Sequence, residues 1–135
     1  MGTVVWKISI AHVPNENCKM ISPQTLAWTS LLIGGWAVGN GILHTAAVIK
    51  DHFKEYDRNF LYYLLNGHII IFLGVFEMIA SYGLRDGQTW GIFVSGTAAI
   101  GMIIYCAMIW KFLPSFLTVI LQSSLIVMFA IQFFK

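Results

Sequence analysis

The chain has 135 residues, of which 58% are hydrophobic and only 10% are charged, and its mean hydropathy is +0.75. Soluble domains carry about 25% charged residues, so this composition excludes an ordinary water-soluble domain and predicts an integral membrane protein surrounded by a lipid bilayer. The net charge of +2 is too small to suggest a nucleic-acid partner.

Residues 1–23 are expected to form an N-terminal tail at the membrane interface. Apolar side chains alternate with smaller or charged ones from Trp6 to Ala11, a period of two that is typical of an extended strand. An isolated strand is only marginally stable. The tail is therefore predicted to be an extended segment anchored by Trp6, with pairing to another chain as the alternative.

Four apolar stretches follow, at about residues 24–49, 60–84, 90–110 and 113–134. Each is long enough for a bilayer core, which takes about 20 residues of helix. Short connections join antiparallel neighbours, so residues 24–135 are expected to form an all-α, up-down bundle of four transmembrane helices. Both termini then lie on the same side of the membrane. Lys and Arg divide evenly between the two sides, and orientation stays open.

Small residues recur at helical spacing in the first two stretches. Gly35 and Gly39 form a GxxxG pattern, and Gly67, Gly74 and Ser81 recur every seven residues. In lipid, helices associate by close packing at small residues rather than by exclusion of water. These five positions are predicted to be helix-packing sites.

Two clusters of polar residues flank the first connection. With a rise of about 1.5 Å per residue, Asn40 and His44 lie about 15 and 9 Å deep, and Asn66 and His68 about 9 and 12 Å. His68 is roughly 160–180° around its helix from both Asn66 and Glu77. We therefore expect Asn40, His44 and Asn66 to join the two helices, and His68 to point outward to a partner.

The same residues allow ligand roles as alternatives. His44 and His68 are possible haem or metal ligands, because imidazole is an axial haem ligand. A zinc or copper site would need further ligands, which no HxxxH or CxxC spacing supplies. Helical phase argues against one closed site made by both histidines.

Among the Asp, Glu, Lys and Arg residues, only Glu77 lies well inside a predicted span. Such residues are expensive in lipid and are by default functional candidates. We interpret Glu77 as a possible proton or ligand site, with Asn66, Asn40 and His44 as further candidates; the alternative is a neutral carboxyl that only packs helices. At its depth, hydrogen-bond donors are expected from neighbouring helices, namely Thr29, Ser30, Ser95, Thr97, Gln122, Ser123 and Ser124.

Aromatic residues are expected to form belts at the two membrane interfaces, where Trp and Tyr are enriched. Those assigned to one face are Trp28, Tyr82 and Trp90, and those assigned to the other are Tyr56, Tyr62, Tyr63, Tyr105 and Trp110.

The stretch LGVFEMIASYGLRDGQTWG, residues 73–91, resembles the second-helix signature of DoxX-like small membrane proteins. In that pattern a G-x-x-E group precedes an apolar half-helix, a short basic turn and a third helix, and Gly74, Glu77 and Arg85 match it. The tail and the Asn-Gly-His clusters depart from the pattern. The resemblance implies a four-span topology and, from some family members, a link to quinone-dependent oxidoreductases.

These features predict an accessory or structural subunit of a larger membrane assembly, such as a respiratory, photosynthetic or other oxidoreductase complex, or a self-associating protein. We expect no catalytic activity of the chain alone, since no nucleophile and base occur at a suitable spacing. One alternative is a redox subunit that handles haem or quinone through Glu77 and a histidine; a pigment would also suit aromatic grooves. Another is a small oligomeric carrier or channel.

Overall fold

The structure, a computed structural model, describes residues 21–52, 57–111 and 115–133. These residues form four helices: α1 (Pro23–His52), α2 (Arg58–Arg85), α3 (Thr89–Ile109) and α4 (Phe116–Phe133). The all-helical fold is confirmed, and each predicted span matches one helix to within a few residues. The predicted strand-like tail lies outside the described residues.

Local signals at the helix ends explain where the helices begin and turn. The Ser22 hydroxyl accepts a hydrogen bond from the Thr25 backbone N–H at 3.0 Å, and Pro23 occupies the first position of α1. Asp57 caps α2 by accepting from the Phe60 N–H at 2.7 Å. After α2 the chain reverses at Gly87, whose φ of +66° favours glycine. This turn brings α3 back antiparallel to α2.

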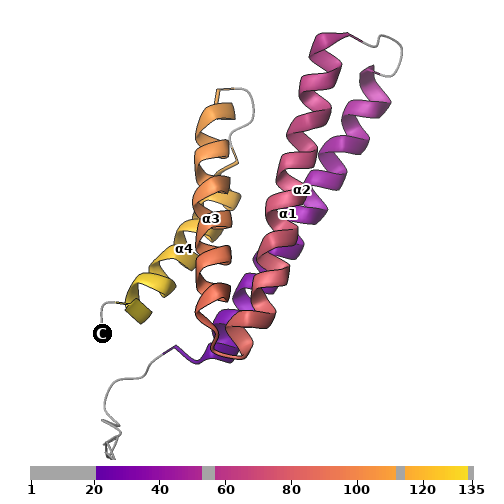
Figure 1. Ribbon diagram of the computed structural model, residues 1–135. Helices are drawn as coiled ribbons and strands as arrows, with labels where there is room; N and C mark the ends of the chain where they lie inside the picture. Colours follow the sequence, from indigo (N-terminus) through magenta and orange to yellow (C-terminus); the bar gives the residue numbers. More distant parts are fainter. Residues whose placement is uncertain (1–20, 53–56, 112–114, 134–135) are drawn as a thin grey trace, which may run out of the picture.

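The helices are arranged as a long hairpin, α1–α2, with α3 packed on α2 and a tilted α4 packed on α3 (Figure 1). α4 also returns to α1, where the Gln132 side-chain amide donates to the Ile21 carbonyl oxygen at 3.5 Å. The first and last described segments therefore meet at one end of the bundle. Helices α1 to α3 are each long and apolar enough to cross a membrane, whereas α4 is apolar but shorter.

Two pairs of glycines hold α1 against α2. A Cβ atom placed on Gly34 would lie 2.6 Å from the carbonyl oxygen of Gly74, and one on Gly41 would lie 2.8 Å from that of Gly67. Real Cβ atoms do not approach so closely, so the two backbones touch only because these positions lack side chains. The partners are seven residues apart on each helix, which gives matching contacts in an antiparallel pair.

Gly35 and Gly39 do not pack against another helix of the described part of the chain. Both glycines are exposed, and nothing lies within 4 Å of a Cβ built on either. Gly34 and Gly41 take the contacts on α1 instead, since they fall on the opposite side of that helix. On α2, Gly67, Gly74 and Ser81 are all buried.

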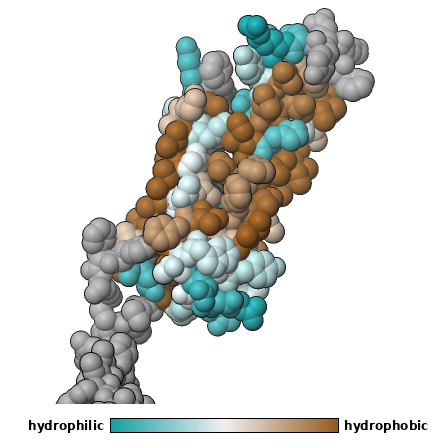
Figure 2. Space-filling model, in the orientation of Figure 1, coloured by the Kyte–Doolittle hydropathy of each residue, from teal (hydrophilic) through white to brown (hydrophobic). Residues whose placement is uncertain are grey.

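The outside of the bundle is apolar. Figure 2 shows mainly apolar side chains along the middle of the visible face, with polar ones gathered toward the two ends. Large apolar residues such as Leu43, Phe72 and Met108 are between 64% and 77% exposed. Exposure on this scale fits contact with lipid. The chain is thus a multi-pass, membrane-type four-helix bundle.

Inside, apolar side chains form two clusters. One includes Leu26, Leu84 and Leu125, and the other includes Ile70 and Met102. Tyr105 belongs to the second cluster, because it is buried rather than exposed in an interfacial belt. Its placement in the predicted belt is therefore corrected. Trp28, Tyr82 and Trp90 are exposed near the other end of the bundle, as belt residues are.

Candidate functional site

Four polar side chains, one from each helix, are completely buried in the bundle. They are Ser30 of α1, Glu77 of α2, Ser95 of α3 and Gln122 of α4, each with an exposure of 0%. On α2, Glu77 lies between Ile70 of one apolar cluster and Leu84 of the other. The site is therefore enclosed by apolar packing along that helix, and we call these four residues the polar core.

Hydrogen bonds connect three of the four helices in the polar core. The Ser30 hydroxyl donates to the backbone carbonyl of Glu77 at 3.0 Å, and it lies 3.0 Å from the Ser95 hydroxyl. A serine hydroxyl has one hydrogen. Because Ser30 gives that hydrogen to Glu77, Ser95 is the donor in the Ser30–Ser95 pair. The backbone of Glu77 is thus fixed in place.

The backbone carbonyl of Glu77 is hydrogen-bonded, whereas its side-chain carboxyl is not hydrogen-bonded to any described residue. The Gln122 side chain lies within interacting distance of the Glu77 carboxyl. Even so, neither carboxyl oxygen of Glu77 and neither amide atom of Gln122 has a hydrogen-bond partner within 3.5 Å among the described residues. An unpaired buried polar group costs about 1–3 kcal/mol, and a charged one costs more. The arrangement offers three oxygen acceptors and one amide donor group for a proton, a water molecule or a small cation.

The sequence-predicted partners of Glu77 separate into two groups. Ser30, Ser95 and Gln122 are in the polar core. By contrast, Thr97 is exposed, and Ser124 is exposed and donates to Leu121 of its own helix at 2.7 Å. Thr29 and Ser123 are half-buried and outside the polar core. Of the seven predicted partners, Ser30, Ser95 and Gln122 are therefore the three that share the buried site with Glu77.

The three residues expected to join α1 and α2 make no such bond. Asn40, His44 and Asn66 are half-buried, and within residues 21–52, 57–111 and 115–133 none of their side chains is hydrogen-bonded to another helix. The Nε2 atom of His44 is buried without a partner in this part of the chain. Their expected joining role is corrected, because the glycine contacts bring the backbones together without polar bridges. None of the three reaches the polar core by a hydrogen bond.

His68 is exposed on the outer side of α2, as its helical phase predicts. Its Nδ1 atom lies 2.8 Å from the carbonyl oxygen of Leu64, one turn earlier. A carbonyl only accepts, so Nδ1 carries a proton, and in the neutral imidazole Nε2 is then the acceptor. The ring is thereby held in one orientation with its second nitrogen available to a neighbour.

A shared ligand site for the two histidines is not formed. His44 is half-buried on α1 and His68 is exposed on α2. Among the described residues no group of three His, Cys, Asp or Glu side chains is placed to hold a metal ion. Within the described part of the chain, neither histidine therefore belongs to a metal-ligating group.

Comparisons with known proteins add no relative: no protein-family model, curated protein or solved structure matches the chain. The resemblance of residues 73–91 to DoxX-like proteins thus stays a prediction from the sequence. Within that stretch, Gly74 faces Gly34 and Glu77 lies in the polar core. Two of the three matching positions, Gly74 and Glu77, consequently have structural roles of their own.

Proposed function

We propose that this chain is an accessory subunit of a larger membrane assembly, and that the outer face of α2 around His68 docks on a helix of another subunit. The observation that carries the proposal is the exposed imidazole of His68. It lies about 15 Å along α2 from Arg58 and about 26 Å from Arg85, well inside the apolar part of the helix. Titratable side chains within membrane spans almost always face protein or a water-filled cavity. A partner helix is needed to supply that environment here.

The rest of the face suits a helix partner. Exposed apolar side chains lie on the same face of α2, within about 60° of His68: Leu61, Leu65, Phe72, Val75 and Ile79. Phe72 and Phe76 pack edge to face with ring centroids 4.7 Å apart. This contact restricts the movement of both rings, so this part of the surface is rigid. We infer that the partner places a hydrogen-bond donor, such as a Ser, Thr or Asn side chain, opposite Nε2 of His68.

The proposed assembly is of the respiratory, photosynthetic or oxidoreductase kind, with both ends of this chain on the same side of the membrane. Its role there is to pack and orient neighbouring helices, and no catalytic residue is assigned to it. Support for the common side comes from the contact of Gln132 with Ile21.

The test is the mass of the native particle after gentle extraction into lipid nanodiscs. The wild-type chain is expected in a particle that contains other membrane subunits. His68→Leu should release it as a free chain, because the substitution removes the polar contact while keeping the surface apolar. Ile104→Ala is the control: Ile104 is 56% exposed on α3. Recovery of the wild type only as a monomer, or only as a homo-oligomer, would contradict the proposal.

A second function is favoured by the unpaired carboxyl of Glu77. We propose that the polar core binds a proton or a small polar ligand for redox, quinone-linked or carrier activity of the assembly. Infrared difference spectra of the purified protein should show a carboxyl signal that titrates or responds to added quinone, and Glu77→Gln should remove it. Ser124→Ala, which changes an exposed hydroxyl outside the polar core, should leave the signal intact. A spectrum identical in wild type and Glu77→Gln would exclude this second function.

A further inference from the structure

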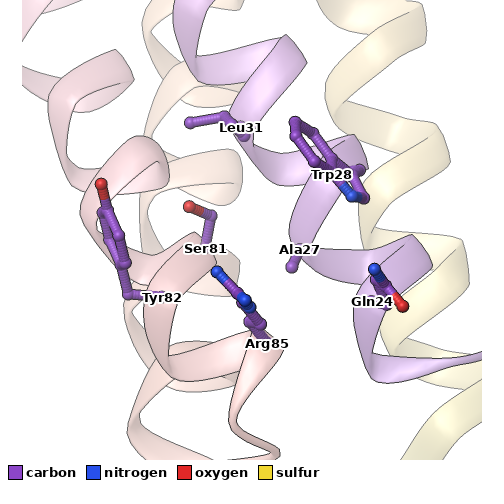
Figure 3. Close-up of a pocket in the computed structure, with 7 residues that line it drawn as sticks. All are labelled: Gln24, Ala27, Trp28, Leu31, Ser81, Tyr82 and Arg85. Atoms are coloured by element: carbon purple, nitrogen blue, oxygen red, sulfur yellow. The ribbon is translucent and has the colours of Figure 1, made fainter.

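A pocket lies at the end of the bundle where α1 begins and α2 ends. Its volume is about 260 Å³. Figure 3 shows Arg85 turned from the end of α2 into the space beside Ser81 and Ala27, with Gln24 and Trp28 on the α1 side. The complete lining is formed by Gln24, Ala27, Trp28, Leu31, Ser81, Tyr82 and Arg85.

The pocket lies at the depth of lipid headgroups. Gln24 is the second residue of α1 and Arg85 is the last residue of α2, so the pocket opens at the polar end of both helices. Trp28 and Tyr82 are 57% and 69% exposed, as interfacial anchors are. Within the described ranges, the side chain of Arg85 makes no hydrogen bond or ion pair. Its charge is available to a ligand.

We propose that this pocket binds the phosphate of an anionic phospholipid from the surrounding leaflet. A guanidinium matches the oxygens of a phosphate with two parallel hydrogen bonds. The Gln24 amide and the Trp28 indole N–H add donors from α1. Ser81 donates to the Met78 carbonyl at 2.6 Å, so it shapes the wall rather than donating to the phosphate. Basic pockets between transmembrane helices are a known arrangement for anionic headgroups.

The surface beneath the pocket favours a lipid over a soluble phosphate. At about 100° per residue, Gln24, Trp28, Leu31, Gly35 and Gly39 fall within about 80° on one side of α1. Gly35 and Gly39 are exposed, with nothing within 4 Å of a built Cβ. Because Gly35 and Gly39 lack side chains, the backbone of α1 is open to a neighbouring molecule on the same side as the pocket, further into the apolar zone. The acyl chain of a lipid held in the pocket can pack against these open positions, whereas a free phosphate has no apolar part to contact them.

The first test uses the full chain in nanodiscs of phosphatidylcholine with a minor fraction of phosphatidylglycerol, and measures the lipids that remain bound after detergent extraction. The wild type should be enriched in phosphatidylglycerol. Arg85→Gln should lower that enrichment about fivefold. One basic residue contributes about 1 kcal/mol to the attraction of an anionic lipid, and this free energy corresponds to a factor of about five in lipid binding. Arg58→Gln is the matched control at the other end of α2 and should retain the enrichment. Equal enrichment in Arg85→Gln and wild type, or equal losses in the two variants, would overturn the proposal.

A second measurement distinguishes the lipid from a soluble anion. Glycerol 3-phosphate is added to the protein in discs of phosphatidylcholine alone, and binding is followed by calorimetry. No saturable binding is expected, because the soluble compound lacks the acyl chain. Saturable binding that disappears in Arg85→Gln would instead identify a site for a water-soluble phosphate and overturn the lipid assignment.

Discussion

The side-chain hydroxyls of Ser30 and Ser95 lie 3.0 Å apart in the interior of the bundle, although the two residues belong to α1 and α3. The hydroxyl of Ser30 also reaches the Glu77 backbone at 3.0 Å. Three helices therefore meet through one serine. This arrangement fixes the position of Glu77 while leaving its carboxyl without a hydrogen bond among the described side chains.

The pair of serines should be weakly but measurably coupled. Hydrogen bonds between membrane helices average about 0.6 kcal/mol in double-mutant cycles. We expect Ser30→Ala and Ser95→Ala to lower the free energy of unfolding, with a coupling energy near that value. Unfolding by a denaturing detergent, monitored by circular dichroism, gives the free energies of unfolding of the wild type, the two single variants and the double variant. Strict additivity of the two substitutions would show that the hydroxyls do not interact.

Replacing Glu77 by methionine should stabilise the bundle. Methionine is similar in size and flexible, and it removes a buried polar group that costs about 1–3 kcal/mol when unpaired. The free energy of unfolding of Glu77→Met should therefore rise by about 1 kcal/mol or more, at the expense of any function of the carboxyl. Asn66→Met, half-buried on the same helix, should change it little. A clear loss of stability in Glu77→Met would show that the carboxyl stabilises the contacts between the helices.

Gly34 and Gly35 are neighbours that should respond oppositely to alanine. At Gly34 the new Cβ meets the Gly74 backbone at 2.6 Å, so Gly34→Ala must push α1 and α2 apart at a cost of about 1–3 kcal/mol. At Gly35 the new Cβ meets nothing, and alanine is favoured over glycine in a helix by about 0.5–1 kcal/mol. The same unfolding assay should show a loss for the first variant and a small gain for the second. A loss of similar size in both would mean that Gly35 is also covered in the folded protein.

The fold followed from the sequence because apolar length and turn residues decide it locally. The spans near residues 60–84 and 90–110 end within two residues of α2 and α3, where Asp57 caps one helix and Gly87 turns the chain. The predicted depth of Ser30, Ser95 and Gln122 was also sufficient to place them at the level of Glu77.

The side of each helix that faces its neighbour was harder to predict. GxxxG pointed to Gly35 and Gly39, yet the contact on α1 uses Gly34 and Gly41. The available signal was the seven-residue spacing of Gly34 and Gly41, which equals that of Gly67 and Gly74. Asn40 and Asn66 were expected to bridge the helices, but close backbone contact at the glycines leaves their side chains half-buried and unbonded within the described part of the chain. Such contacts depend on the crossing of two helices, which no single stretch encodes.

The proposed subunit role is tested most directly by a photo-crosslinking amino acid placed at position 68 in the native membrane. His68 lies about 26 Å from the Arg85 end of α2, and Ile104 on α3 lies at a similar distance, about 23 Å, from Thr89. The account predicts one dominant protein product from position 68, identified by mass spectrometry as another membrane subunit, and mainly lipid adducts from position 104. Lipid adducts alone from position 68, or equal protein products from both positions, would contradict it.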